Sequence, residues 1–257
     1  MQRSFTYSAL TLRVKPSGES NREAWFLTAE EGILRATVFG GPKSRLRSHV
    51  APFHAGTLWI YHDPLRDSRK VSDFDVKLWR PGIRELWERA TTANTVAETV
   101  LASHGGGGNW GEAAKLAENA LDTLDEADSA ACSRIGTGFL WQWTRILGAR
   151  PDFPVCSSCA CKARDDTALW YSAREEALFC EECYREKCFH DPNTANPVFR
   201  LGPGAISWLK AIATQPSDVS AAADVVATAD ALGQARAFSR ALLASAIGKS
   251  LPTWDEM

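Results

Sequence analysis

The first third of the chain alternates hydrophobic and polar residues in short runs. Between residues 10 and 15, the hydrophobic positions Leu10, Leu12 and Val14 alternate with polar ones, which is the two-residue period of a strand with one buried face. Further hydrophobic runs cover residues 24–28, 33–39, 58–61 and 71–76. Five short strands favour a small closed barrel, because closure removes exposed sheet edges. Residues 40–52 are polar and rich in Gly and Pro, and we expect a long loop there.

Beyond residue 82 the hydrophobic pattern changes to the period of a helix. Hydrophobic residues recur every three or four positions over residues 83–101, 112–124 and 130–147. Four consecutive glycines at 105–108 break the first of these runs and predict a flexible connection between two helices. The alanine-rich segment 204–248 predicts about three more helices, with breaks at Pro216 and Gly233.

Six of the seven cysteines fall between residues 156 and 188 and interrupt the helical pattern. Two Cys-x-x-Cys motifs lie twenty residues apart, a spacing typical of a structural zinc site. A two-residue gap lets both thiolates face one ion, and two such turns complete a tetrahedron. The ligands predicted in this way for one structural Zn²⁺ are Cys156, Cys159, Cys180 and Cys183. The segments 168–172 and 177–179 read as a β-hairpin whose ends carry the motifs.

Other readings of the cysteines remain open in part. Cys161 can compete with Cys159, and Cys188 or His190 can replace Cys183. Disulfides are disfavoured because nothing marks the chain as secreted, and a redox pair or an iron–sulfur cluster lacks its usual sequence context. Four thiolates leave no vacant position on zinc, so the metal is expected to be structural. The histidines show no catalytic motif, and we expect a protein that is not an enzyme. Cys132, among small apolar residues, reads as core.

Composition adds a difference in charge between the two ends of the chain. Of 257 residues, 45% are hydrophobic, which indicates a folded protein. Residues 1–81 carry 13 Lys and Arg against 8 Asp and Glu, whereas the remainder carries 16 against 23. A basic front end attracts polyanions, although the excess is also compatible with ordinary surface chemistry. No run approaches the roughly 20 apolar residues of a membrane span, and the N-terminus has no signal-peptide pattern. A cytosolic protein is the expectation.

The predicted loop after the third strand concentrates cations. Two glycines precede Lys43, Ser44, Arg45 and Arg47, residue types that contact phosphate oxygens without reading sequence. Arg13, Lys15 and Arg35 lie on neighbouring predicted strands and extend this strip. A solvated turn is the alternative reading of the loop. Trp25, Phe39 and Trp59 are either barrel core or stacking surfaces for unpaired bases.

Several short motifs, taken in order, resemble the family of the bacterial recombination mediator RecO. The resemblance extends over essentially the whole chain. It is carried by Leu27-Thr28 before Glu31-Gly32, by Gly40-Gly41-Pro42-Lys43-Ser44, by Pro52-Phe53, by Trp87-Glu88-Arg89-Ala90, and by Gly148-Ala149-Arg150-Pro151-Asp152-Phe153 leading into the first cysteine motif. The last of these is the most specific.

The resemblance implies an α+β multidomain fold. Residues 1–80 would form a five-stranded OB-fold β-barrel that binds DNA, and residues 81–150 and 192–257 a C-terminal α-helical bundle. Residues 151–191 would be an inserted zinc ribbon with four cysteine ligands. In this family the basic loop at Lys43, Ser44, Arg45 and Arg47 would contact DNA, and the two cysteine pairs would hold the zinc.

The implied function is that of a mediator in DNA repair. Such proteins bind single- and double-stranded DNA without sequence preference and anneal complementary strands. They act with RecR to load RecA onto DNA coated by single-strand-binding protein (SSB), and they recognise the SSB C-terminal tail. No membrane or small-molecule substrate is expected, and the location would be the nucleoid.

Two features of the chain depart from the pattern of the RecO family. Ala160-Cys161 stands where many relatives have Gly, and the helical part is acidic for a DNA-binding protein. The second departure favours an alternative function, a zinc-ribbon scaffold that assembles repair or replication factors without direct DNA contact.

Overall fold

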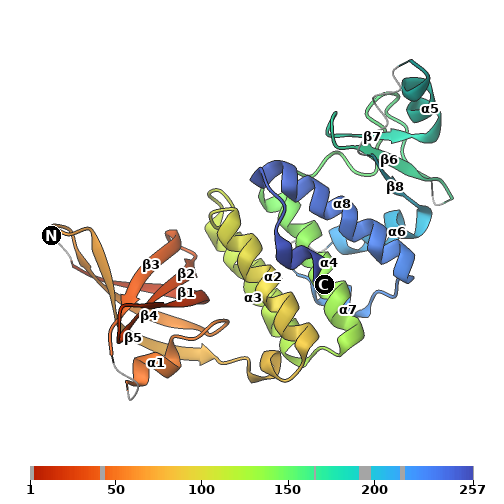
Figure 1. The fold of residues 1–257 in the computed structure, drawn as a ribbon. Helices are drawn as coiled ribbons and strands as arrows, with labels where there is room; N and C mark the ends of the chain where they lie inside the picture. The colour runs from red at the N-terminus through yellow and green to blue at the C-terminus, as the bar shows by residue number, and fades with distance from the viewer. Residues whose placement is uncertain (1–2, 41–43, 165, 191–197, 215–217, 257) are drawn as a thin grey trace. The chain divides into compact units, whose positions relative to one another are not determined.

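The computed structural model describes residues 3–40, 44–164, 166–190, 198–214 and 218–256. They form two compact units, residues 1–126 and residues 127–257, which are described separately (Figure 1). The domain boundaries expected from the sequence, at residues 80, 150 and 191, stay predictions.

The first unit begins with a closed five-stranded barrel (Figure 1). Its strands follow the order β1-β2-β3-β5-β4, with β4 pairing back onto β1. The β3–β5 contact is parallel and the other pairs are antiparallel, so the predicted OB-type barrel is confirmed. The bounds are β1 Ser4–Ser17, β2 Asn21–Thr28, β3 Gly32–Val38, β4 Ala55–Asp63 and β5 Ser68–Leu78.

The alternation predicted for β1 is interrupted by a change of register between Thr11 and Arg13. As a result, Leu10, Thr11 and Leu12 are all buried in succession. Ala24 and Phe26 of β2 point into the barrel core, whereas Leu27 is buried on the outer face. The barrel therefore buries one end of its outer surface as well as its interior.

A short helix, α1 (Arg45–His49), occupies part of the segment expected to be a loop. Leu46 packs against the barrel core, and Val50, directly after the helix, is a member of that core. The prediction of a loop was wrong here. A helix of five residues is shorter than two turns, so its hydrophobic residues cannot show a helical period in the sequence.

Two longer helices cover the buried end of the outer barrel surface. After the 3₁₀ turn η1 (Pro81–Arg84), α2 (Trp87–Ala102) and α3 (Trp110–Glu126) lie side by side (Figure 1). The glycine run between them adopts positive φ at each of its four positions, which glycine accepts without a Cβ penalty. Gly105 lies against Leu27 and Ile33, and Gly32 lies against the Trp110 ring. These contacts join the helical pair to strands β2 and β3.

A buried arginine fastens the same helices to the barrel. The Arg80 side chain is 2% exposed, and its Nε donates to Asp122 of α3 at 2.7 Å. Its Nη1 donates to the carbonyl oxygen of Phe53 at 2.6 Å. Both Arg80 and Phe53 adopt positive φ, which is costly for non-glycine residues. The hydrogen bonds of this guanidinium hold the end of β5 against the turn before β4.

The second unit is built from helices and a small sheet. Apart from a helix in the cysteine segment, its helices are α4 (Ser129–Ile146), α6 (Pro203–Ala213), α7 (Ser220–Asp224) and α8 (Ala229–Ile247), followed by the 3₁₀ turn η3 (Pro252–Asp255). Gly233 lies inside α8, so the predicted helix break there was wrong, and Pro216 lies outside the described residues. Packing on one face of α8 outweighs the modest helix propensity of a single glycine. Cys132 is buried in α4, as expected.

The small sheet belongs to the cysteine segment. Strands β6 (Leu169–Ser172) and β7 (Ala177–Cys180) form the predicted hairpin, and β8 (Val198–Leu201) adds a third strand in the order β7-β6-β8. Helix α5 (Glu181–His190) follows directly after β7. The third strand and this helix were not predicted.

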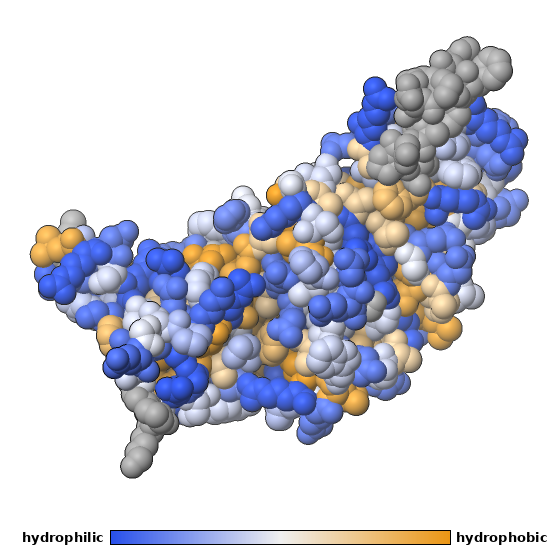
Figure 2. Space-filling model, in the orientation of Figure 1, coloured by the Kyte–Doolittle hydropathy of each residue, from blue (hydrophilic) through white to orange (hydrophobic). Residues whose placement is uncertain are grey.

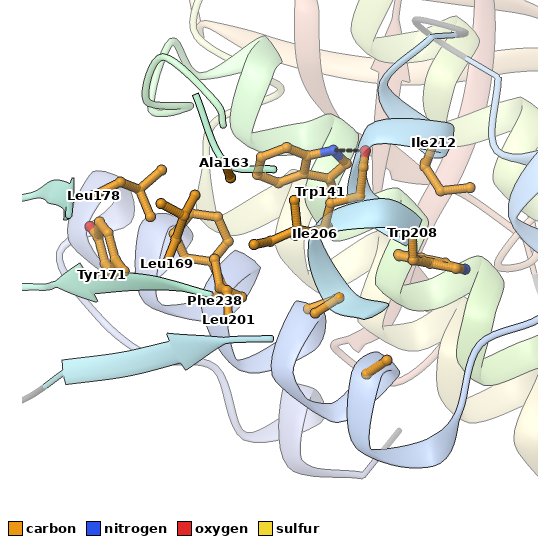
Figure 3. Close-up of a cluster of buried hydrophobic side chains, with 14 of the residues drawn as sticks. Trp141, Ala163, Leu169, Tyr171, Leu178, Leu201, Ile206, Trp208, Ile212 and Phe238 are labelled. Carbon is orange, nitrogen blue, oxygen red and sulfur yellow. Dashed lines mark hydrogen bonds between the residues drawn. The ribbon is translucent and has the colours of Figure 1, made fainter. Parts of the chain in front are cut away.

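One hydrophobic cluster joins this sheet to the helices (Figure 3). Tyr171 of β6 meets Phe238 of α8 edge to face, with ring centroids 5.0 Å apart. Trp141 of α4 packs against Phe238, and its indole N–H donates to the carbonyl of Leu209 at 3.1 Å. The sheet is therefore part of the core of the second unit. Among the described residues, no helix combines the length and hydropathy needed to cross a membrane.

The contact of Gly32 with Trp110 allows a test of how the helical pair is attached. Gly18 and Gly32 both have φ near +70°, but a Cβ at Gly18 meets nothing within 4 Å, whereas one at Gly32 lies 2.7 Å from Trp110 Nε1. We predict that Gly18→Ala lowers the free energy of unfolding by about 1–2 kcal/mol through backbone strain alone. Gly32→Ala should cost about 1–3 kcal/mol more because of overpacking. Urea unfolding measures both, and equal losses would contradict the packing argument.

Candidate nucleic-acid interface and metal centre

The basic loop predicted from the sequence lies at one end of the barrel. Lys43 is outside the described residues. Ser44 immediately precedes α1, and its carbonyl accepts a hydrogen bond from the N–H of Arg47. Arg45 and Arg47 are on the helix itself. Ser44, Arg45 and Arg47 are therefore carried by one short element packed on the barrel core.

Arg45 is engaged by an acidic partner in the unbound protein. Its Nη2 lies 3.2 Å from each carboxylate oxygen of Asp73 on β5. The pKa of Asp73 is lowered first by the backbone N–H of Phe74, which donates to it, and also by Arg45, against the opposing effect of burial. Asp73 therefore stays ionised at neutral pH, and a phosphate has to compete with it for Arg45.

The remaining predicted cations form a row on the outer face of β1, β2 and β3. Trp25 of β2 pairs with Arg13 on one side and with Arg35 on the other. The Lys15 ammonium lies over the Trp25 ring, 5.8 Å from its centroid, which is within cation–π range. Arg35 forms an ion pair with Glu23 at 3.2 Å. The structure thus brings Arg13, Lys15 and Arg35 together around one tryptophan.

The sequence left open whether three aromatic residues belong to the barrel core or offer stacking surfaces. All three lie outside the cluster of buried residues inside the barrel. Trp25 is half-buried, Phe39 is 45% exposed and Trp59 is 37% exposed. Lys70 lies over the Phe39 ring at 5.2 Å. Trp59 is on β4, where it pairs with Thr6 and Asp73 rather than with the cationic row.

A cleft of about 280 Å³ opens beside this row, between the β1–β2 turn and α1. Its walls include Lys15 of β1, Arg22 of β2 and Arg47 of α1, together with Glu19. The guanidinium Nη1 of Arg22 donates to the carbonyl of Arg47 at 3.2 Å. Lys15 also belongs to the row around Trp25, so the cleft and the row are adjacent.

The electrostatics of this cleft favour an anion. The pKa of Arg22 is lowered first by burial and then by the positive charge of Arg47, so the two guanidinium groups repel each other. A phosphate between them would relieve that repulsion and accept charge-assisted hydrogen bonds. Sequence reasoning missed Arg22. Its alternation with Ala24 and Phe26 places it on the core-facing side of β2, where an apolar residue is expected. Only the position of α1 shows that its side chain lies beside Arg47.

Hydrophilic side chains cover much of the barrel face seen in Figure 2. This agrees with a surface whose outward strand positions carry charge.

The second candidate site is the cysteine cluster. The Sγ atoms of Cys156, Cys159, Cys180 and Cys183 all lie within 4.8 Å of one another, and those of Cys159 and Cys180 are 3.8 Å apart. A tetrahedron with bonds of about 2.3 Å to a central ion has edges of about 3.8 Å. The first two cysteines lie in the loop after α4, and the others lie at the end of β7 and the start of α5.

Backbone donors favour thiolates in the first cysteine motif. Burial raises the pKa of the Cys156 thiol, but N–H groups of Cys159, Cys180 and Ser158 donate to it and bring the pKa down to about 6. The pKa of Cys159 is also lowered, chiefly by the backbone N–H of Cys161. The pKa of Cys183 is raised, first by its hydrogen bond with Cys180. A bound cation would let all four thiols ionise together, and the four could hold one metal ion.

The structure bears on the alternative ligands only in part. Cys161 is exposed and lies outside the group of four, although its thiol is hydrogen-bonded with Cys159 and Cys180. The side chains of Cys188 and His190 are outside the described part of the chain.

Comparison with known proteins shows that the segments carrying both sites match one protein family. The family description "Recombination protein O N terminal" matches residues 1–76, and "Recombination protein O C terminal" matches residues 84–255. The chain belongs to the recombination protein O family. This confirms the resemblance found in the sequence.

A curated relative of the same family is DNA repair protein RecO from Acaryochloris marina (strain MBIC 11017). It is 29% identical over 103 residues, which are 39% of this chain and 34% of the relative. The chain thus matches about a third of that relative's length. The family is one of DNA repair and recombination.

The geometry of the cysteine cluster predicts which substitutions remove a metal. Cys156→Ser and Cys183→Ser should each abolish stoichiometric metal in the purified protein, because three thiolates no longer close the tetrahedron. Both should also make residues 151–191 sensitive to protease, since metal binding contributes to local folding. Cys161→Ser, the matched control, should keep its metal. Elemental analysis and limited proteolysis measure these outcomes, and full retention in Cys183→Ser would move that ligand to Cys188 or His190.

Proposed function

We propose that this protein is a non-enzymatic mediator of recombinational DNA repair. It binds single- and double-stranded DNA without sequence preference and anneals complementary strands. With RecR it helps to load RecA onto single-stranded DNA coated by SSB, in the nucleoid of the cytoplasm. Family membership over both halves of the chain supports this assignment. The observation that carries the DNA-binding step is the cleft lined by Arg22 and Arg47 at the end of the barrel, where the Arg22 guanidinium donates to the Arg47 carbonyl.

The proposed DNA surface combines this cleft with the cationic row. It consists of Lys43, Ser44, Arg45 and Arg47 in and before α1, Arg13, Lys15 and Arg35 on the strands, and Arg22. All are residue types that contact the DNA backbone, which accounts for binding without sequence preference. Glu19, Glu23 and Asp73 lie among them, so the net positive charge of the surface is moderate. Because the contacts with phosphate are ionic, DNA binding is expected to weaken as the salt concentration rises.

We further propose that the metal in the cysteine cluster is one structural Zn²⁺. Four thiolates in a tetrahedral arrangement suit zinc and leave no open coordination position for a substrate. When bound, the ion would hold the loop after α4 to the end of β7 and so stabilise the sheet. The protein's DNA chemistry would take place elsewhere, on the barrel.

The SSB tail requires a second surface. A cleft of about 490 Å³ in the second unit is lined by the residues following α4, by Tyr171 and by the last turns of α8, including Leu242 and Ala246. Arg150 lines the same cleft. Burial lowers the pKa of Arg150 to about 10, so its guanidinium stays charged at neutral pH. The lining also includes one carboxylate, Glu176, which is hydrogen-bonded to Ser245. Apolar groups beside a cation suit the end of a peptide chain, whose terminal carboxylate needs a positive partner. We place the SSB tail here.

The acidic charge of the chain after residue 81 favours a second candidate function, a scaffold that assembles repair or replication factors without direct DNA contact. A gel shift at low salt separates the two functions. The mediator retards an oligonucleotide, and the scaffold leaves it unshifted.

The salt dependence of DNA binding tests the barrel cleft. Each phosphate contact contributes about 0.9 to the log–log salt slope on duplex DNA and about 0.7 on single strands. The Arg22→Ala/Arg47→Ala double variant should therefore lower the slope by about 1.8 on duplex DNA and about 1.4 on single strands. Fluorescence titration over a series of salt concentrations measures it. Arg66→Ala, an exposed cation in the β4–β5 turn, should leave the slope unchanged, and an unchanged slope in the double variant would remove the cleft from the interface.

A pull-down with SSB tests the peptide cleft. Ala246 is exposed at its wall, so Ala246→Glu adds bulk and negative charge without opening the core. We predict at least a roughly tenfold loss of SSB binding, about 1.4 kcal/mol, with binding to naked DNA unaffected. Ala229→Glu at the other end of α8 should retain binding. Equal binding by both variants, or capture of SSB that lacks its tail, would place the contact elsewhere.

A further inference from the structure

Trp25 is set apart from the other large aromatic side chains of β1–β3 by its position. It lies on the outer face of the barrel, while its neighbours Ala24 and Phe26 point into the core. Its cross-strand partners are the cations Arg13 and Arg35, and the Lys15 ammonium lies over its ring. A half-buried indole surrounded in this way adds no apolar contact to the barrel core.

We propose that Trp25 is a stacking platform for one unpaired base, and that the neighbouring phosphate sits in the cleft between Arg22 and Arg47. The barrel would then prefer single-stranded to double-stranded DNA. The inference rests on the DNA binding proposed above and adds to it the form of the bound strand and the residue that selects it.

The two parts of this subsite are adjacent because Lys15 belongs to both. Its ammonium lies over the Trp25 ring, and the same residue lines the cleft that contains Arg22 and Arg47. A nucleotide complements these two parts. Its flat base can stack on the indole, and its anionic phosphate can bind the cations of the cleft. Stacking of a base on the indole would displace the Lys15 ammonium from the ring toward the phosphate, where its charge is better neutralised.

Selection for single strands follows from which surfaces each form of DNA presents. The phosphates of a duplex can reach Arg22 and Arg47, but its bases are stacked on one another and their faces are covered. An unpaired base has a free face, and stacking on an aromatic side chain tolerates any base. The cleft therefore contributes to binding of both forms, whereas Trp25 contributes to one. Two acidic residues also belong to this surface: Glu19 lines the cleft, and Glu23, which pairs with Lys15 across the strands, forms an ion pair with Arg35.

The experiment compares three probes of equal length: oligothymidylate, an abasic oligodeoxyribose phosphate, and a duplex. The wild-type protein should bind oligothymidylate more tightly than the abasic strand. Trp25→Ala should weaken oligothymidylate binding by on the order of 10- to 100-fold and leave the abasic strand, the duplex and the salt slope nearly unchanged. Trp59→Ala removes an outward tryptophan from β4 and should match the wild type on all three probes.

Further variants guard against a folding defect at this position. Trp25→Leu keeps apolar bulk and lacks the ring, and Trp25→Phe keeps a ring. Only the phenylalanine variant should retain most of the preference for oligothymidylate over the abasic strand. If Trp25→Leu and Trp25→Phe behave alike, or if the substitutions weaken all three probes equally, the stacking role is wrong and Trp25 serves the sheet. If the wild type binds none of the probes, the proposed function itself fails.

Discussion

The candidate DNA surface depends on how the barrel closes its end. A five-stranded barrel leaves an open mouth, and α1 fills it with Leu46 while Val50 continues into the core. The same helix carries Arg45 and Arg47, and its position brings Arg47 to Arg22. Packing of these two apolar side chains against the barrel core thus fixes the positions of the cations. The need to close the mouth and the need to present positive charge are met by one turn of helix.

A second dependence links the cysteine cluster to the helices. Cys180 ends the strand β7, which pairs with β6, and Tyr171 of β6 packs against Phe238 in the middle of α8. A bound ion would therefore stabilise a sheet that is part of the core, and its effect would extend to α8 and to the cleft lined by Leu242. A structural metal, as proposed here, would affect the proposed peptide cleft through this packing.

Patterns with a strong local cause were predictable from the sequence. The barrel strands follow from alternation and turn residues, and the four cysteines follow from a spacing that geometry imposes on a tetrahedral ion. The family motifs added the domain order. Features that depend on contacts distant in sequence were missed. Helix α1 is too short to show a period, and β8 is recognisable as a strand only beside β6.

Arg22 shows most clearly what the sequence alone could not predict. Its strand position marks it as core-facing, and its role depends on a helix more than twenty residues away. At Gly233 the sequence predicted a helix break that the structure does not have. Glycine weakens a helix locally, but packing of Phe238 and Leu242 stabilises α8 as a whole. Lys43 lies outside the described residues, and its predicted role remains an expectation.

The ion pair between Arg45 and Asp73 has a consequence for how long a strand stays bound. A phosphate that reaches Arg45 replaces a carboxylate already in place, so the exchange trades one partner for a similar one and yields little net free energy. Asp73 remains beside the arginine and can take it back as soon as the strand shifts. Such competition shortens residence times, which suits the annealing activity proposed for this protein, because paired strands have to be released.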